Sequence, residues 1–232
     1  MIKSINGLYH DMPNEDYHGR FSYEKDGWIS SSLLKAAMGG WQSYEAFLED
    51  DFKQTPSMRF GTIVHHALLE SDSFSDVWGG KLTKGENEKL DKILSHFPTN
   101  VLDQLGACDS EVSLFQNDTR EKVRFDGINQ DHGIIFDIKT TSSFDGFKWV
   151  VPKYSYDLQA YFYLKVAKQF YNKDCKFIWV AVETVKPFRV NWFTPSYETL
   201  NKGEEKYVQA IDSLVSFKDG YERIISNELE LI

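Results

Sequence analysis

The clearest pattern of apolar and polar positions lies near the middle of the chain, at residues 133–141. The apolar positions there are rich in β-branched and aromatic residues, which predicts a largely buried strand. Because strand side chains alternate between faces, Asp137 and Lys139 should share one face of the sheet. Phe136 and Ile138 should point to the other. An acid and an amine so placed form either a surface ion pair or part of a buried, paired or metal-binding site.

A period of two also runs through residues 110–115 and 121–128, which predicts two more strands joined to the first in an antiparallel meander. Asp126 should lie on the face opposite Phe125. If Phe125 packs beside Phe136, Asp126 shares a face with the acid and the amine of the neighbouring strand. A slip of one residue in register would undo this alignment.

Helical periodicity and capping signals predict most of the remaining elements. Helices are expected at residues 33–38, 43–49, 58–70, 82–96, 98–105, 154–170 and from 195 to about 218, and strands at 176–183 and 188–194. Residues 1–28 look irregular. This order predicts an α/β (α+β) fold in which a central mixed β-sheet is flanked by helices. We expect one domain over residues 1–232, made of a lead-in at 1–57, a core at 58–194 and a C-terminal helix and tail at 195–232.

Two predicted helices carry polar residues within apolar faces. His65 lies with Gly61 on the core-facing stripe of one helix, whereas His66 is turned away by about 100°. Such a histidine is usually a hydrogen-bonded core residue, and it gains weight as a ligand only where carboxylates converge on it. On the later helix, Tyr156, Gln159 and Tyr163 share a row. Aromatic rows are usually core, but a buried amide needs partners.

Composition and charge narrow the possible functions without deciding among them. The chain has 232 residues, of which 41% are hydrophobic, enough for one sizeable core. Its net charge of −9 is unfavourable for binding phosphate, although lysines outnumber acids between residues 139 and 176. Two cysteines without a CxxC pair argue against a zinc ribbon, an iron–sulfur cluster or a disulfide framework. The chain shows neither a membrane-length apolar run nor a signal peptide, so we expect an intracellular protein.

Taken together, the polar residues that stand out are the ingredients of a divalent-metal site. They are two acids separated by a short hairpin, a lysine, a glutamate on the preceding strand and an upstream histidine: Asp126, Asp137, Lys139, Glu111 and His65. Oxygen ligands suit Mg²⁺, which polarises a phosphoryl oxygen and lowers the pKa of bound water. A nearby lysine can orient that water and offset charge on the phosphoryl oxygens. The mixture indicates phosphodiester hydrolysis.

Four short motifs, in this order, resemble those of the PD-(D/E)XK nuclease superfamily. They are FGTIVH at residues 60–65, FDG at 125–127, DIKTT at 137–141 and YDLQA at 156–160 followed by Tyr163. The resemblance is closer to the RecE-type exonucleases of phages and prophages (exonuclease VIII), relatives of the RecB nuclease domain and λ exonuclease. It covers residues 30–193 and implies a restriction-endonuclease-like core.

The resemblance also implies a role for individual residues. His65, Asp126, Asp137 and the backbone carbonyl of Ile138 would bind metal, as two Mg²⁺ ions for which Mn²⁺ can substitute. The doubled histidine leaves His66 as the other candidate, and the Gly-x-x-x-His spacing favours His65.

Further roles concern catalysis and DNA. Lys139 would activate or position the attacking water, Glu111 resembles the family's active-site glutamate, and Gln159 would buttress the site. Contacts to DNA are expected from Tyr156, Tyr163, Thr140, Ser31, Lys148 and Lys153. For Ser31, a simple place in the helix cap made by residues 30–32 is the plainer alternative.

Some features depart from the family pattern. Phe125 stands where the superfamily name has a proline, a position that varies in the RecE-like branch. The four-cysteine staple of AddB-like and Cas4-like relatives is absent, and so are helicase and P-loop motifs. These absences favour a free-standing nuclease domain.

The function implied by the resemblance is a Mg²⁺-dependent exonuclease on double-stranded DNA ends. It would digest one strand processively from 5′ to 3′ and leave a 3′ tail for a RecT-like annealing protein in recombination. Relatives form trimeric or tetrameric rings, and encirclement would help an acidic chain to hold DNA. The protein would be phage or prophage encoded and act in the bacterial cytoplasm. Two alternatives remain: an endonuclease or nickase of the same fold, and a catalytically silent DNA-binding protein.

Overall fold

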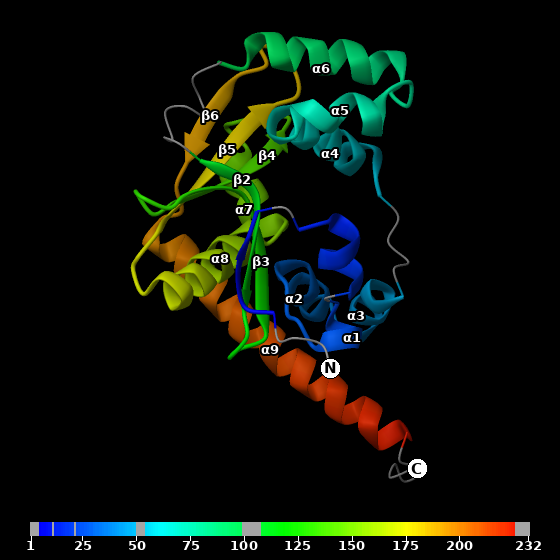
Figure 1. Cartoon of the computed structure of the whole chain (residues 1–232), viewed down its shortest axis with the longest axis vertical. Coiled ribbons are helices and arrows are strands. Elements are labelled where there is room, and N and C mark those ends of the chain that lie inside the picture. Colours follow the sequence, from blue (N-terminus) through cyan, green and yellow to red (C-terminus); the bar gives the residue numbers. More distant parts are fainter. Residues whose placement is uncertain (1–4, 11, 21, 50–53, 99–107, 226–232) are drawn as a thin grey trace.

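A six-stranded sheet forms the centre of the computed structural model, which describes residues 5–10, 12–20, 22–49, 54–98 and 108–225 (Figure 1). Its strands, in spatial order, are β1 (Gly7–Tyr9), β2 (Asp109–Gln116), β3 (Glu121–Asn129), β4 (Ile134–Thr141), β5 (Lys176–Glu183) and β6 (Val190–Phe193). Among these strands β4 and β5 pair in parallel, and the other neighbours are antiparallel. The prediction of a mixed sheet flanked by helices is confirmed.

The helices cover both faces of this sheet. They are α1 (Tyr23–Asp26), α2 (Ser31–Met38), α3 (Trp41–Leu48), α4 (Pro56–Leu69), α5 (Ser71–Trp78), α6 (Lys84–His96), α7 (Phe147–Lys153), α8 (Tyr156–Tyr171) and α9 (Tyr197–Ile225), with a π-helix at Asp16–Arg20. Figure 1 shows α4, α5 and α6 together at one end of the molecule, and α9 running past α8 and α2 toward the C-terminus. None of the described helices has the length and apolarity that crossing a membrane requires.

Five of these elements were not expected from the sequence. The strand β1, the π-helix and α1 lie within residues 1–28, where turn residues hide their pattern, and α5 follows α4 almost directly. The seven-residue α7 contains Pro152 and is too short to show a periodicity. The helix expected at residues 98–105 falls, apart from its first position, outside the described residues.

Two apolar clusters pack against opposite faces of the sheet. Side chains of α2, α8 and α9 pack on one face against β2, β3 and β5, whereas α4 and α6 cover β4 and β5 on the other. Phe125 belongs to the first cluster, where its ring centroid lies 5.5 Å from that of Tyr163. Phe136 and Ile138 belong to the second. The packing of Phe125 beside Phe136 that the alternation suggested is therefore wrong.

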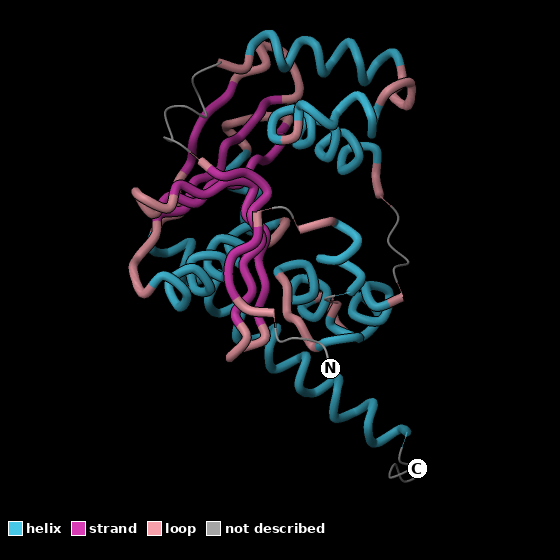
Figure 2. The backbone as a smooth tube through the Cα atoms, viewed as in Figure 1, coloured by secondary structure: helices cyan, strands magenta, loops and turns pink. Residues whose placement is uncertain are grey.

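The reason is a bend in β2 and β3 at one level of the sheet (Figure 2). Glu111 has a φ of 52°, in the left-handed region, and it stands opposite Asp126 where the β2–β3 ladder is interrupted. The pairing of β3 with β4 reaches Gly127 opposite Phe136 and continues no further toward Asp126. A Cβ at Gly127 would lie 2.1 Å from the Phe136 ring, so this crossing requires glycine. The bend shifts the alternation of side chains between Phe125 and the end of β3.

Two buried carboxylates hold α8 and α9 in place. Glu121 accepts hydrogen bonds from Lys165 Nζ at 2.6 and 2.8 Å and from the Tyr207 hydroxyl at 2.6 Å. Asp157 accepts from Lys206 Nζ at 2.8 Å on each oxygen. Both acids are almost fully buried, and each carboxylate oxygen has a cationic partner.

Candidate metal centre

Three potential ligands converge from three separate elements. His65 comes from α4, Glu111 from β2 and Asp126 from β3, and one ligand atom of each lies within 4.8 Å of the others. The His65 Nε2 atom is 2.5 Å from Asp126 Oδ2, and its Nδ1 atom is 3.5 Å from Glu111 Oε1. An imidazole and two carboxylates are a donor set that can hold a divalent cation.

The position of His65 follows from how α4 crosses the sheet. The helix begins at Pro56, with the Thr55 hydroxyl accepting a hydrogen bond from its first turn. A Cβ at Gly61 would lie 3.3 Å from the hydroxyl oxygen of Thr140, so glycine lets α4 approach β4 closely. His65 follows one turn later on the same side. His66 points elsewhere, since its Nε2 atom lies 2.8 Å from Ser73 Oγ of α5. Of the two histidines, the structure brings His65 to the acids.

Asp126 is fixed by the end of the β3–β4 pairing. Its Oδ2 atom accepts a hydrogen bond of 2.6 Å from the backbone N–H of Ile138. This contact uses the freed amide of β4 at the point where the two strands separate. The N–H is the group of Ile138 that the structure brings to Asp126, and the ligand role of its carbonyl stays a prediction.

Asp137 and Lys139 form a second, adjoining part of the site. Asp137 is buried, and its Oδ1 atom accepts a 2.7 Å hydrogen bond from the amide of Gln159 on α8. Its Oδ2 atom lies 2.6 Å from Lys139 Nζ, which in turn lies 4.8 Å from the centre of the Tyr156 ring. Glu111, which was predicted as a catalytic residue, therefore lies beside His65. Asp137, which was predicted as a metal ligand, instead contacts the amine of Lys139 and the amide of Gln159.

A residue that sequence reasoning missed completes this group. Lys35 of α2 donates a 3.4 Å hydrogen bond to Gln159 Oε1, and its Nζ atom lies 5.4 Å from the centre of the Tyr156 ring. The signal that could have found it is a lone lysine within the otherwise apolar helix at residues 33–38. Its partners lie more than 100 residues away, which periodicity does not reveal.

The close acids perturb one another's protonation. Burial alone would lower the pKa of His65, but the carboxylate of Asp126 outweighs it and raises that pKa to about 9. Burial, reinforced by Asp126, raises the pKa of Glu111 to about 7. Asp137 has a raised pKa because burial outweighs Lys139, whereas His65 holds the pKa of Asp126 below its usual value against the effect of burial. Three acids, Glu111, Asp126 and Asp137, thus share this site with two cations that contact them, His65 and Lys139.

The residues expected to contact DNA fall into two groups. Tyr156 and Thr140 are half-buried beside the site, and Lys148 and Lys153 are exposed on α7. Exposed aromatic rings accompany both lysines, with Trp149 69% exposed.

The second group lies below the surface. Tyr163 is buried among aromatic rings, and burial raises its pKa, so it can support the site but presents almost no surface to a ligand. Ser31 is also buried in the first turn of α2, and Ser30 is the residue whose hydroxyl caps that helix. The burial of Tyr163 and Ser31 therefore contradicts the prediction that they contact DNA directly.

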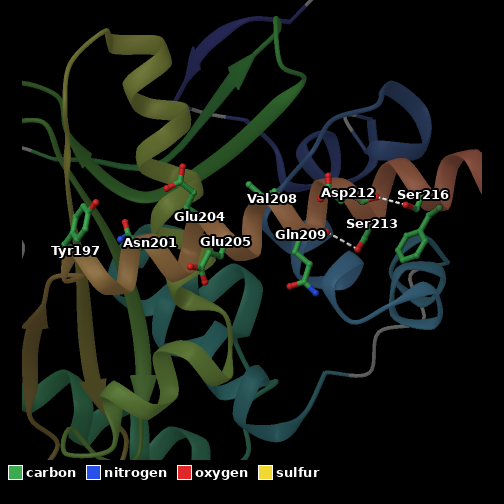
Figure 3. Close-up of a pocket in the computed structure, with 10 residues that line it drawn as sticks. Tyr197, Asn201, Glu204, Glu205, Val208, Gln209, Asp212, Ser213 and Ser216 are labelled. Carbon is green, nitrogen blue, oxygen red and sulfur yellow. Dashed lines mark hydrogen bonds between the residues drawn. The ribbon is translucent and has the colours of Figure 1, made fainter.

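A separate hollow lies along the outer face of α9, with Tyr197, Glu204 and Asp212 among its lining residues (Figure 3). It contains none of the residues predicted for the metal site.

Comparison with known proteins identifies the family of the chain. Residues 30–228 match the family described as "PDDEXK-like domain of unknown function" (DUF3799). The chain belongs to this PDDEXK-like family. Its fold is accordingly that of the PD-(D/E)XK nuclease superfamily.

One solved structure adds a fold likeness. A "putative exonuclease" of Eubacterium rectale superposes with a TM-score of 0.74 at 14% identity, covering 90% of this chain and 87% of the other. A phage-related exonuclease of Haemophilus somnus 129PT gives a TM-score of 0.40 at 14% identity, covering 87% and 96%. None of the curated proteins matches the chain.

Proposed function

We propose that this PDDEXK-like protein is a Mg²⁺-dependent deoxyribonuclease that acts as an exonuclease on double-stranded DNA ends. The observation that carries the proposal is the convergence of His65, Glu111 and Asp126 beside the Asp137–Lys139 pair. The fold likeness to a protein named as an exonuclease supports the choice of ends over internal bonds.

The donor set fits a divalent cation. Glu111 Oε1 is buried and accepts no hydrogen bond from any described residue, and burial, reinforced by Asp126, raises the pKa of Glu111. A buried acid left in this state is costly unless a cation compensates it. His65, Glu111 and Asp126 would hold the ion, with Asp137 and the Ile138 carbonyl as further ligands and Mn²⁺ as a substitute for Mg²⁺. A bound ion would supply a Lewis acid for the phosphoryl oxygen and lower the pKa of the attacking water.

The chain's own residues orient the reactants. Lys139 is held by Asp137, which raises the pKa of its ammonium against burial, so it carries its proton at neutral pH. In that state it donates hydrogen bonds to the attacking water or to a non-bridging phosphoryl oxygen. Gln159 fixes the carboxylate of Asp137 from the other side. Tyr156 flanks the ammonium and limits the access of solvent to it.

The finer parts of the proposal come from the resemblance to RecE-type exonucleases. They are processive 5′→3′ digestion, release of a 3′ tail to a RecT-like annealing protein, a trimeric or tetrameric ring and action in the cytoplasm of a bacterium carrying the phage or prophage. The exposed lysines and aromatic rings of α7 support contact with DNA near the site.

Two alternatives are distinguished by the same experiment. A linear duplex labelled at one 5′ end and a closed circular plasmid are incubated with wild type and Lys139→Ala, with Mg²⁺ or EDTA. The proposal expects Mg²⁺-dependent release of labelled mononucleotide from the linear DNA alone, lost in the variant. Cutting of the circle would favour an endonuclease or nickase. No cleavage of either DNA by folded protein that still binds DNA would favour the silent DNA-binding protein.

A further inference from the structure

The ammonium of Lys35 differs from the other half-buried lysines near acids. Lys139, Lys165 and Lys206 each have a carboxylate oxygen within 2.8 Å. The described residues place no carboxylate oxygen within 4.0 Å of Lys35 Nζ, whose hydrogen-bond acceptor is the neutral amide oxygen of Gln159. Burying a cation without a counter-ion is unfavourable. Burial and the nearby Lys139 accordingly lower the pKa of Lys35 to about 7.

The contacts of Lys35 place it next to the Asp137–Lys139 pair. Gln159 joins the two parts, because its amide nitrogen donates to Asp137 while its oxygen accepts from Lys35. The Tyr156 ring lies beside both ammonium groups, 5.4 Å from Lys35 and 4.8 Å from Lys139. Two cations from separate elements thus border one ring next to the acid cluster.

An anion is the ligand that would complete this arrangement. Phosphate oxygens accept hydrogen bonds from an ammonium and supply the missing charge. We propose that Lys35, positioned by Gln159 and Tyr156, binds a phosphate group of the DNA strand beside the phosphate that is hydrolysed at Lys139. This proposal rests on the proposed nuclease function, because it names a further contact of that same substrate.

Salt dependence of DNA binding tests the contact without requiring cleavage. Binding of a fluorescent duplex is measured in EDTA between 50 and 200 mM salt for wild type, Lys35→Gln, Lys35→Arg and the control Lys92→Gln, an exposed lysine on α6. Loss of one phosphate contact should weaken binding by roughly tenfold and lower the slope of log affinity against log salt by about 1. Lys35→Arg should retain most of the affinity, and Lys92→Gln should match wild type.

Thermal unfolding separates phosphate binding from a structural role. Since no described carboxylate pairs with Lys35, Lys35→Gln should melt at or above the wild-type temperature. Inorganic phosphate should raise the melting temperature of wild type more than that of the variant. This difference is expected even if the protein does not cleave DNA. An unchanged salt slope in Lys35→Gln, or equal stabilisation of both proteins by phosphate, would overturn the proposal.

The source of the phosphate is distinguished with two DNA ends. Duplexes with a 5′-phosphate and with a 5′-hydroxyl are compared for wild type and Lys35→Gln. An equal loss of affinity on both assigns Lys35 to an internal phosphodiester, and a loss confined to the phosphorylated end assigns it to the terminal phosphate. Absence of any loss on either duplex would contradict the proposal.

Discussion

The molecule contains two groups of buried acids, which differ in how the charge of their carboxylates is compensated. Beneath α9, Glu121 and Asp157 have a cationic partner for each carboxylate oxygen. At the candidate metal centre, Glu111 has a buried oxygen that accepts no hydrogen bond from any described residue, and burial raises the pKa of Glu111 to about 7. The first group is electrically balanced by the chain itself. In the second group three acids, Glu111, Asp126 and Asp137, contact two cations, His65 and Lys139, and one carboxylate oxygen accepts no hydrogen bond from the described residues.

A structural ion pair can be distinguished from a functional one by whether each buried charge has a partner within the chain. A balanced buried pair stabilises the folded chain against loss of either partner. An unbalanced group costs stability and is maintained for a ligand that supplies the missing charge. Substitutions in the two groups should therefore affect different properties: catalysis and metal response at the site, and thermal stability beneath α9.

The largest expected effect is on catalysis. Asp126→Asn removes the charge of a candidate ligand, which costs several kcal/mol of transition-state stabilisation and lowers cleavage on the order of 10³-fold. Glu121→Gln, in the balanced group, should retain the wild-type turnover at 25 °C while it melts earlier. Cleavage rates and circular dichroism of both variants make the comparison. Equal loss of turnover in the two variants would remove the distinction between the groups.

Next is the stability of the balanced group. Lys165→Met leaves the buried Glu121 without its ammonium partner, which should lower the free energy of unfolding by about 3 kcal/mol. The melting temperature should then fall by roughly 6–12 °C. Lys168→Met on the same helix removes an exposed pair with Asp174 and serves as the control, with a change below about 0.5 kcal/mol. A similar melting temperature for the two variants would contradict the prediction.

Metal binding should affect the unbalanced group alone. Mg²⁺ or Mn²⁺ at about 100 times its dissociation constant should stabilise wild type by about 2.7 kcal/mol, because it binds the folded site and neutralises the acids. EDTA should reverse the shift in melting temperature. The same addition should stabilise Lys165→Met as much as wild type, since that variant retains the site. A wild-type melting curve that excess metal leaves unmoved would count against a clustered site.

The smallest effect is the pH dependence of the metal-free protein. The pKa values of Glu111 and His65 rise on folding, from 4.5 to about 7 and from 6.5 to about 9. Folded protein therefore binds more protons than unfolded protein in this window, so these two groups make stability fall as the pH rises from about 5 to 9. Asp126, with a lowered pKa, acts in the opposite sense and in more acidic solution.

A substitution isolates the glutamate's part of this dependence. Glu111→Gln should make the metal-free protein more stable by about 1 kcal/mol at pH 8 and flatten the decline between pH 5 and 7. Thermal melts in EDTA at several pH values measure both. Stabilisation by Mg²⁺ should grow with pH in wild type, since binding releases protons. If wild type and the variant lose stability equally between pH 5 and 7, Glu111 does not titrate as inferred.

Much of the fold and part of the site could be predicted from local pattern. The strand leading into Asp137, the helix carrying His65 and the row containing Gln159 all follow from regular periodicity and motif spacing. Periodicity assumes regular elements, however. The predicted placement of Phe125 was wrong because β2 bends at Glu111, whose backbone has a positive φ. A positive φ at a non-glycine residue cannot be recognised from the sequence.

Lys35 was missed for a different reason. Its role depends on contacts with Gln159 and Tyr156, which are brought to it by tertiary packing of α2 against α8. A single lysine in a short amphipathic helix predicts only a side chain that reaches solvent. Tyr163 shows the reverse case, because its helical row predicted the correct neighbourhood while its burial was not visible from spacing.

The close contact of Gly127 with the Phe136 ring has one more consequence. The bend that begins there brings Asp126 toward His65, a residue of a helix on the far side of the sheet. A methyl group at position 127 would push the two strands apart at the level of the acids. The spacing of the candidate metal ligands therefore depends on a glycine, because any larger residue at position 127 would collide with the Phe136 ring.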